Sequence, residues 1–219
     1  MSSDDVPDSV FEEIEPEILA EIGDPVPVTF AATVVYLPIL VVSLLLCVFW
    51  QETIPGPRFS AGEILTDLGL GAAVGLSLVF LTVFLARYLR PLRELEISFQ
   101  KVLGPLPTSH IIYLALLSGI AEESCFRGWM QPWMGYVPTS ILFGLLHFVP
   151  SKVFLPWTLF ALLVGFIFGA LFEWRESLVA PMTAHILVNG INLHLIVTGR
   201  RLGRRHQDEL VGNIRDEAF

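Results

Sequence analysis

Charged side chains are scarce in this chain of 219 residues. They make up 16% of it, against about a quarter in soluble domains. Hydrophobic residues make up 53%, and the mean hydropathy is +0.65. So low a share of charge excludes an ordinary soluble domain and predicts an integral membrane protein.

Cysteine and N-terminal basic residues are also nearly absent. The two cysteines, Cys47 and Cys125, both lie in apolar surroundings, which excludes a disulfide framework. The first 27 residues hold nine carboxylates and no Lys or Arg, so we expect no secretory signal peptide. The rest of the chain carries 13 acidic and 13 basic groups, and this balance gives no indication of a nucleic-acid partner.

Long apolar stretches dominate the remainder. Three carry no charge and reach the roughly 18 to 20 residues that a spanning helix needs, namely residues 28–50, 68–86 and 153–172. Three further stretches contain polar residues and cover about 108–131, 133–150 and 178–198. We therefore predict an all-α, polytopic bundle of about six transmembrane helices around a central polar cavity.

Composition divides the chain into four parts. They are an acidic tail that we expect to be disordered and cytoplasmic (1–27), two spans with a cytoplasmic loop (28–104), a core of motif-bearing helices (105–198) and a basic cytoplasmic tail (199–219). Apolar residues at helical spacing leave a docking helix as the alternative for the acidic tail. The distribution of Lys and Arg favours both termini in the cytoplasm, and the sequence of residues 87–107 predicts a surface helix.

The segment 118–130, "SGIAEESCFRGWM", places three charges in an apolar stretch, where each is costly. Glu123 and Arg127 are four residues apart, on one helical face, in the order that favours an ion pair. Glu122 points about 100° away and has no basic residue three or four positions off. It is the charge that packing leaves unexplained.

Polar groups recur in the later stretches at His147, His185 and Asn189, with Asn192 continuing the last face. A carboxylate and an imidazole that share a water can direct it at a carbonyl. A second imidazole and a carboxamide one turn apart can donate to the resulting oxyanion. This set of residues predicts peptide hydrolysis without a covalent intermediate.

Two alternatives concern the same residues. Glu122, His147 and His185 with a water would form a zinc ligand set, although no HExxH sequence is present. Ser124 and Cys125 are candidate nucleophiles, but neither has a base four residues away, and we interpret both as small packing residues.

Three motifs in order resemble the CPBP family of intramembrane proteases, which includes the CAAX prenyl protease 2 and bacteriocin-processing groups. They are "EESCFR" (122–127), "FGLLH" (143–147) and "HILVN" (185–189), in a resemblance covering about residues 105–198. It implies that Glu122 and His147 activate water and that His185 and Asn189 form the oxyanion hole. Supporting roles fall to Glu123, Arg127 and Phe143.

The resemblance also bears on cofactor and substrate. It implies a glutamate protease, for which we favour a metal-free reaction over a zinc-dependent one. The expected partners are the lipid bilayer and a membrane-associated peptide that is prenylated, bacteriocin-like or a C-terminal anchor. The sequence indicates no oligomeric state.

Two other functions fit the composition, a noncatalytic immunity or scaffold protein and a proton-coupled transporter, although no inverted repeat favours the latter. One geometric condition separates the protease from both. Glu122 and His147 can share a water only if the fourth segment is short, tilted or partly inserted. We therefore predict a break at residues 130–137, "MQPWMGYV".

Overall fold

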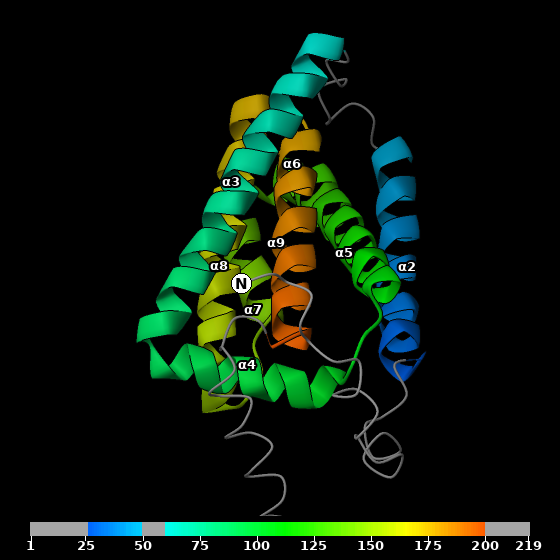
Figure 1. The fold of residues 1–219 in the computed structure, drawn as a ribbon. Helices are drawn as coiled ribbons and strands as arrows, with labels where there is room; N and C mark the ends of the chain where they lie inside the picture. The colour runs from blue at the N-terminus through cyan, green and yellow to red at the C-terminus, as the bar shows by residue number, and fades with distance from the viewer. Residues whose placement is uncertain (1–25, 50–59, 200–219) are drawn as a thin grey trace, which may run out of the picture.

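The computed structural model describes residues 26–49 and 60–199, and its regular structure within these ranges is entirely helical (Figure 1). The helices are α2 (Val26–Phe49), α3 (Ala61–Tyr88), α4 (Arg90–Leu103), α5 (Thr108–Glu123), the π-helix η2 (Ser124–Met130), α6 (Gln131–Met134), α7 (Tyr136–Leu146), the 3-10 turn η3 (Lys152–Phe154), α8 (Leu155–Arg175) and α9 (Val179–Val197). Our expectations for the acidic and basic tails lie outside the described residues, apart from their innermost positions.

Four of these helices, α2, α3, α8 and α9, are long and apolar enough to cross a bilayer. A fifth crossing is obtained if α4 and the helical segment Thr108–Met134, bent by 108° relative to each other, count as one broken span. The structure confirms an all-α polytopic membrane bundle, with four or five crossings in the described ranges where the sequence suggested about six. The difference lies mainly in α7, whose 11 residues are too few to span.

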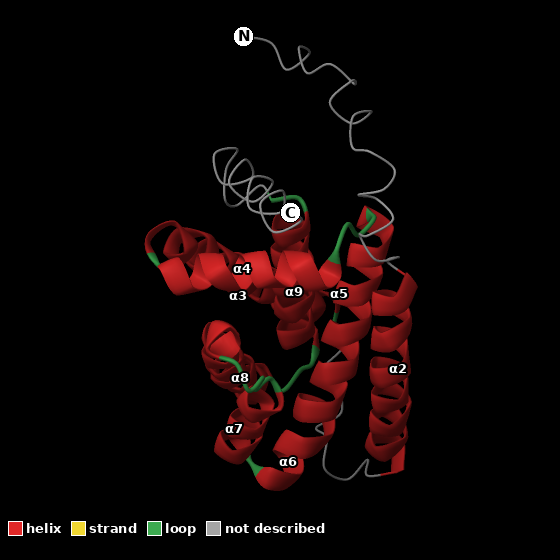
Figure 2. Ribbon diagram, turned by 90° about the horizontal axis from the view of Figure 1, so that it is seen from below, coloured by secondary structure: helices red, strands yellow, loops and turns green. Residues whose placement is uncertain are grey.

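Helix α4 runs across one end of the bundle, nearly perpendicular to the long helices (Figures 1 and 2). Its sequence is amphipathic: Leu95 is buried, while Arg90 and Glu94 form an exposed ion pair at 2.8 Å. The Gln100 side chain donates to the Ile196 carbonyl at 2.6 Å and fixes α4 to the end of α9. The surface helix predicted for this loop is confirmed.

The break predicted near residue 135 is present. Gly135 has φ of 87°, in the left-handed region that side chains rarely adopt, and it separates α6 from α7. Because α7 is short, it ends at Leu146 after three turns, and His147 follows as its C-terminal cap. His147 therefore lies beside the end of α5. If α7 crossed the whole membrane, His147 would lie at the opposite side, far from α5.

Small residues allow α3 and α9 to pack closely. A Cβ atom on Gly75 would lie 2.9 Å from the Ala184 carbonyl oxygen of α9, whereas one on Gly69 would meet nothing within 4 Å. Close helix approach through small residues is common in membranes. It fixes α9, which carries His185 and Asn189, against the rest of the bundle.

Gly75→Ala should therefore destabilise the protein, by about 1 to 3 kcal/mol for an overpacked contact. Gly69→Ala, in the same helix but facing open space, should be neutral or slightly stabilising because alanine favours the helix. Denaturant-induced unfolding in detergent micelles would measure both. Equal free energies of unfolding would contradict the contact between α3 and α9.

Candidate active site

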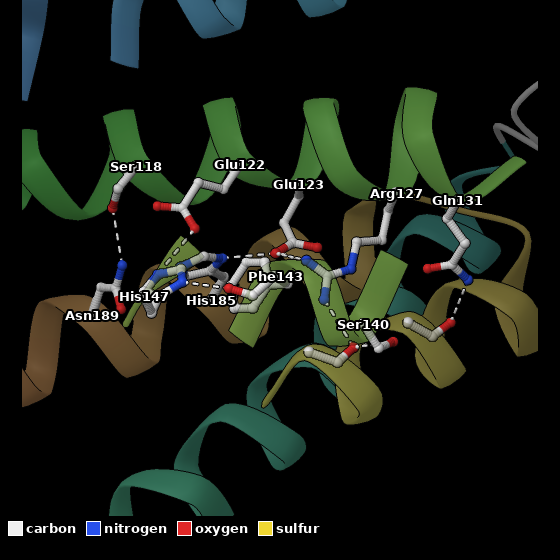
Figure 3. A network of polar contacts seen from close by, with 12 residues as sticks. Ser118, Glu122, Glu123, Arg127, Gln131, Ser140, Phe143, His147, His185 and Asn189 are labelled. Atoms are coloured by element: carbon white, nitrogen blue, oxygen red, sulfur yellow. Dashed lines mark hydrogen bonds and ion pairs between the residues drawn. The ribbon is translucent and has the colours of Figure 1, made fainter. Parts of the chain in front are cut away.

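The two glutamates close helix α5, and the π-helix η2 begins at the next residue. Short π-helical segments are frequent at functional sites. Both glutamates are buried, and the side chains of the α5–η2–α6 segment line up along one edge opposite α7, α8 and α9 (Figure 3). Charges buried in this way are costly unless a nearby group compensates them.

Glu123 is the centre of a buried charge cluster. Its Oε1 accepts from Arg127 at 3.0 Å, which confirms the predicted ion pair, and from His185 Nδ1 at 2.7 Å. Arg127 also donates to the Gly165 carbonyl of α8 at 2.9 Å. Both Glu123 and Arg127 have no solvent exposure. The cluster ties three helices together.

Phe143 lies between the cationic and imidazole groups. Its ring centroid is 4.6 Å from the Arg127 guanidinium carbon and 4.6 Å from the centroid of the His147 ring. Its carbonyl oxygen lies 2.7 Å from His147 Nδ1. Since a carbonyl only accepts, Nδ1 carries the proton of this bond. Phe143 thus sets both the position and the tautomer of His147.

Glu122 and His147 face each other. The distance from Glu122 Oε2 to His147 Nε2 is 3.7 Å, close enough for both groups to contact one shared water. In the neutral ring Nε2 is an acceptor, because Nδ1 holds the proton. Glu122 Oε2 is buried and has no hydrogen-bond partner among the described residues. Two acceptors therefore converge on one point.

Asn189 lies one turn after His185 on α9, as the motif predicts, and its Nδ2 donates to Ser118 Oγ at 2.9 Å (Figure 3). Asn192 accepts from Thr82 of α3 at 3.0 Å and so stabilises α9 away from the glutamates. His147, His185 and Asn189 thus all face the α5–η2 segment that carries Glu122, although His185 contacts Glu123 and not Glu122.

A cavity of about 670 Å³ lies beside the site, although Glu122, His147 and His185 are not part of its wall. Its walls come from α2, α3, α4, α5, α8 and α9 and are mainly leucine. Ser118 and Asn189 lie in its wall, as does Trp157, whose ring centroid is 5.3 Å from that of His147. The polar character that we expected for the whole cavity is confined to a few such groups.

Sequence reasoning missed three residues near the site. Ser118 holds Asn189, and the Tyr36 phenol of α2 interacts with the Glu122 carboxylate while lining the cavity. Gln131 donates to the Gly169 carbonyl and to Glu173 of α8, both at 2.9 Å. Gln131 continues the four-residue spacing of Glu123 and Arg127, and this spacing was a readable signal. Tyr36 lies in a charge-free span, and nothing in the spacing of the surrounding residues indicates a role for it.

The donor set was also compared with the requirements of zinc. A catalytic zinc site needs three converging protein ligands. Nowhere in the described ranges do three His, Cys, Asp or Glu side chains converge in this way. The bonds of His185 Nδ1 to Glu123 and of His147 Nδ1 to Phe143 leave each Nε2 available to a metal, so the misfit lies in the separation of the three groups and not in these bonds. The set Glu122, His147 and His185 therefore does not fit a zinc ion in this arrangement.

Comparison with known proteins agrees with the motifs. Residues 104–191 match the family described as type II CAAX prenyl endopeptidase, Rce1-like. Over 94 residues the chain is 35% identical to the uncharacterized protein YpbD of Bacillus subtilis (strain 168), an alignment that covers 42% of this chain and 48% of YpbD. The chain thus spans about half the length of this curated relative. No solved structure matches the chain described here.

The matched segment contains α5, η2, α6, α7 and α8 and most of α9, and so it holds all three motifs. Helices α2 and α3 lie outside it, although α3 packs against α9 and α2 against α5. Through residues 104–191 the chain is therefore similar to the Rce1-like type II CAAX prenyl endopeptidases, in agreement with the resemblance of its three motifs to the CPBP family.

Proposed function

We propose that the protein is an intramembrane endopeptidase that hydrolyses a peptide bond of a membrane-associated substrate with water activated by Glu122 and His147. The observation that carries the proposal is the 3.7 Å approach of Glu122 Oε2 to His147 Nε2, where a buried acceptor faces a partly buried one. A water that donates to both acceptors turns its oxygen lone pair outward. The family's description as an endopeptidase supports the same chemistry.

In the proposed reaction the water oxygen attacks the scissile carbonyl while one water proton passes to Glu122 or His147. The C–O bond forms and the carbonyl π electrons move to the oxygen, which becomes an oxyanion. Collapse of this tetrahedral intermediate breaks the C–N bond, and the amine leaves with the proton that the base had taken. No acyl-enzyme forms, which agrees with our interpretation of Ser124 and Cys125 as packing residues.

His185 and Asn189 are the proposed donors to the oxyanion. Since His185 Nδ1 donates to Glu123, its Nε2 can donate only when the ring is an imidazolium. With that proton, His185 and Arg127 would balance Glu122 and Glu123, and the buried cluster would carry no net charge. Asn189 can donate in any state of the cluster through its second amide hydrogen.

The proposed substrate is apolar next to its scissile bond, because the cavity beside the site is lined mainly by apolar side chains. A prenylated, bacteriocin-like or C-terminal-anchor peptide would meet this requirement. The test is cleavage of a panel of these three peptide types by the purified protein in proteoliposomes, with the products identified by mass spectrometry. Failure to cut the whole panel would contradict the proposal and favour the noncatalytic alternative.

A proton-coupled transporter also uses buried carboxylates and histidines. The proteoliposomes of the same experiment separate the two functions. A protease cleaves the peptide and leaves a preset pH gradient unchanged, whereas a transporter dissipates the gradient and leaves the peptide intact.

Thorough treatment with a chelator should leave cleavage unchanged, since no three donors converge on a metal site among the residues described. Activity would be measured before and after treatment, with the metal content followed by mass spectrometry. Loss of activity that returns on adding zinc would contradict a metal-free reaction.

A further inference from the structure

We propose that Ser118 is a positioning residue whose hydroxyl holds the Asn189 carboxamide in the orientation that donates to the oxyanion. This inference rests on the proposed hydrolysis and adds a residue that lies outside the three motifs. Ser118 is buried in α5, one turn before Glu122, and it accepts from Asn189 Nδ2 at 2.9 Å. Both side chains lie in the wall of the apolar cavity.

The contact is built into the packing of two helices. Helices α5 and α9 are bridged twice, by Glu123 with His185 at 2.7 Å and by Ser118 with Asn189 at 2.9 Å. Between the bridges lies Gly119, where a Cβ atom would come 2.7 Å from Ile186 Cγ1. Only glycine allows the helices to approach so closely here. The polar face of α9 is therefore held at two points one turn apart.

The direction of the hydrogen bond determines which atom of Asn189 faces the substrate. A serine hydroxyl inside a helix donates back to a carbonyl of the preceding turn, here Ala115 at 3.5 Å, so its oxygen is left to accept. The amide nitrogen of Asn189 therefore turns toward Ser118. Its second hydrogen stays available for the oxyanion.

Without the hydroxyl, the terminal torsion of Asn189 is soft, because such torsions have broad, roughly two-fold preferences. The carboxamide can then turn its oxygen toward the developing negative charge, where it repels and does not stabilise. Ser118 would thus affect the transition state more than substrate binding. That difference separates positioning from a general role in packing.

Ser118→Ala should lower kcat about tenfold, the size expected for one neutral hydrogen bond, with KM nearly unchanged. Asn189→Ala should lower kcat by about 100-fold or more, as loss of an oxyanion donor does. The double variant should be no slower than Asn189→Ala, because Ser118 acts through Asn189. Ser43→Ala is the matched control, since it also removes a buried hydroxyl, one that donates to Ile39 of its own helix α2 and lies against Cys125 of η2 but does not contact Asn189.

A readout independent of activity is the side-chain amide spectrum of protein labelled with ¹⁵N-asparagine. The chain has three asparagines, and Asn189→Ala identifies the pair of signals from Asn189. Ser118→Ala should move that pair and leave the other two in place. An unmoved Asn189 pair, or multiplicative losses of kcat in the double variant, would overturn the positioning role. If the wild type cleaves nothing, the proposed hydrolysis itself is wrong, and the positioning role falls with it.

Discussion

Glu122→Gln should cleave the substrate at least about 100-fold more slowly than the wild type while folding as the wild type does, because removal of a general base costs about 10² to 10⁴ in rate. Glutamine has the shape of glutamate but cannot take a proton from water. The measurement is kcat in proteoliposomes, with the free energy of unfolding of each variant determined in parallel.

The expected retention of the fold follows from the contacts of Glu122. Its Oε2 forms no hydrogen bond within the described ranges, and Arg127 and His185 are both bonded to Glu123. The buried ion pair and the bridge between α5 and α9 therefore do not depend on its charge, and the Tyr36 phenol can still donate to the carbonyl oxygen of a glutamine. The control is Glu94→Gln, which removes a carboxylate from the exposed ion pair on α4 and should leave cleavage unchanged. Equal rates for Glu122→Gln and the wild type would exclude Glu122 as the base.

The different environments of the two adjacent glutamates could be predicted from local spacing. Arg127 lies four residues after Glu123, so one charge finds a partner within its own helix and the other does not. Sequence spacing could not show that the same oxygen of Glu123 also accepts from His185, 62 residues away in sequence. Such pairings depend on how α5 and α9 cross, and this crossing is set by close contacts such as that of Gly119 with Ile186.

The helical break was also predictable, because the requirement that Glu122 and His147 meet demanded one and "MQPWMGYV" offers proline and glycine. The number of membrane crossings was harder to predict from the sequence. Apolar composition marked about 133–150 as a span, but Gly135 and the end of α7 at Leu146 leave only 11 helical residues. Hydropathy indicates that a segment lies in the membrane but does not give the length of its helix. Re-entrant and spanning segments therefore have similar hydropathy.

The residues that sequence reasoning missed share a physical feature. Tyr36 and Ser118 are single polar groups in apolar stretches and carry no spacing signal, whereas Gln131 continues the four-residue spacing of Glu123 and Arg127. Their roles depend on partners in other helices: Tyr36 interacts with Glu122, Ser118 with Asn189 and Gln131 with Glu173. Only the packing of the bundle brings these pairs together.

Glu122→Gln should slow cleavage and leave the fold intact, whereas Glu123→Gln should mainly destabilise the fold. Its removal leaves Arg127, which has no solvent exposure, without the carboxylate that balances its charge. Breaking a buried ion pair from one side costs about 3 to 5 kcal/mol. The chain contains its own reference, the exposed pair of Arg90 and Glu94 at the same i,i+4 spacing, for which the loss should be about 0.3 to 0.5 kcal/mol. Unfolding by denaturant in micelles would compare Glu123→Gln with Glu94→Gln.

A second substitution separates lost charge from lost shape. If the destabilisation comes from an unbalanced Arg127, then Arg127→Met in the Glu123→Gln background should restore part of the stability, because two neutral residues replace a lone buried charge. Cleavage should remain low in the double variant, since His185 no longer faces a carboxylate and Phe143 loses the guanidinium against its ring. A double variant less stable than Glu123→Gln would show that Arg127 stabilises the bundle chiefly through its bond to Gly165 and its packing on Phe143. The ion pair would then be secondary.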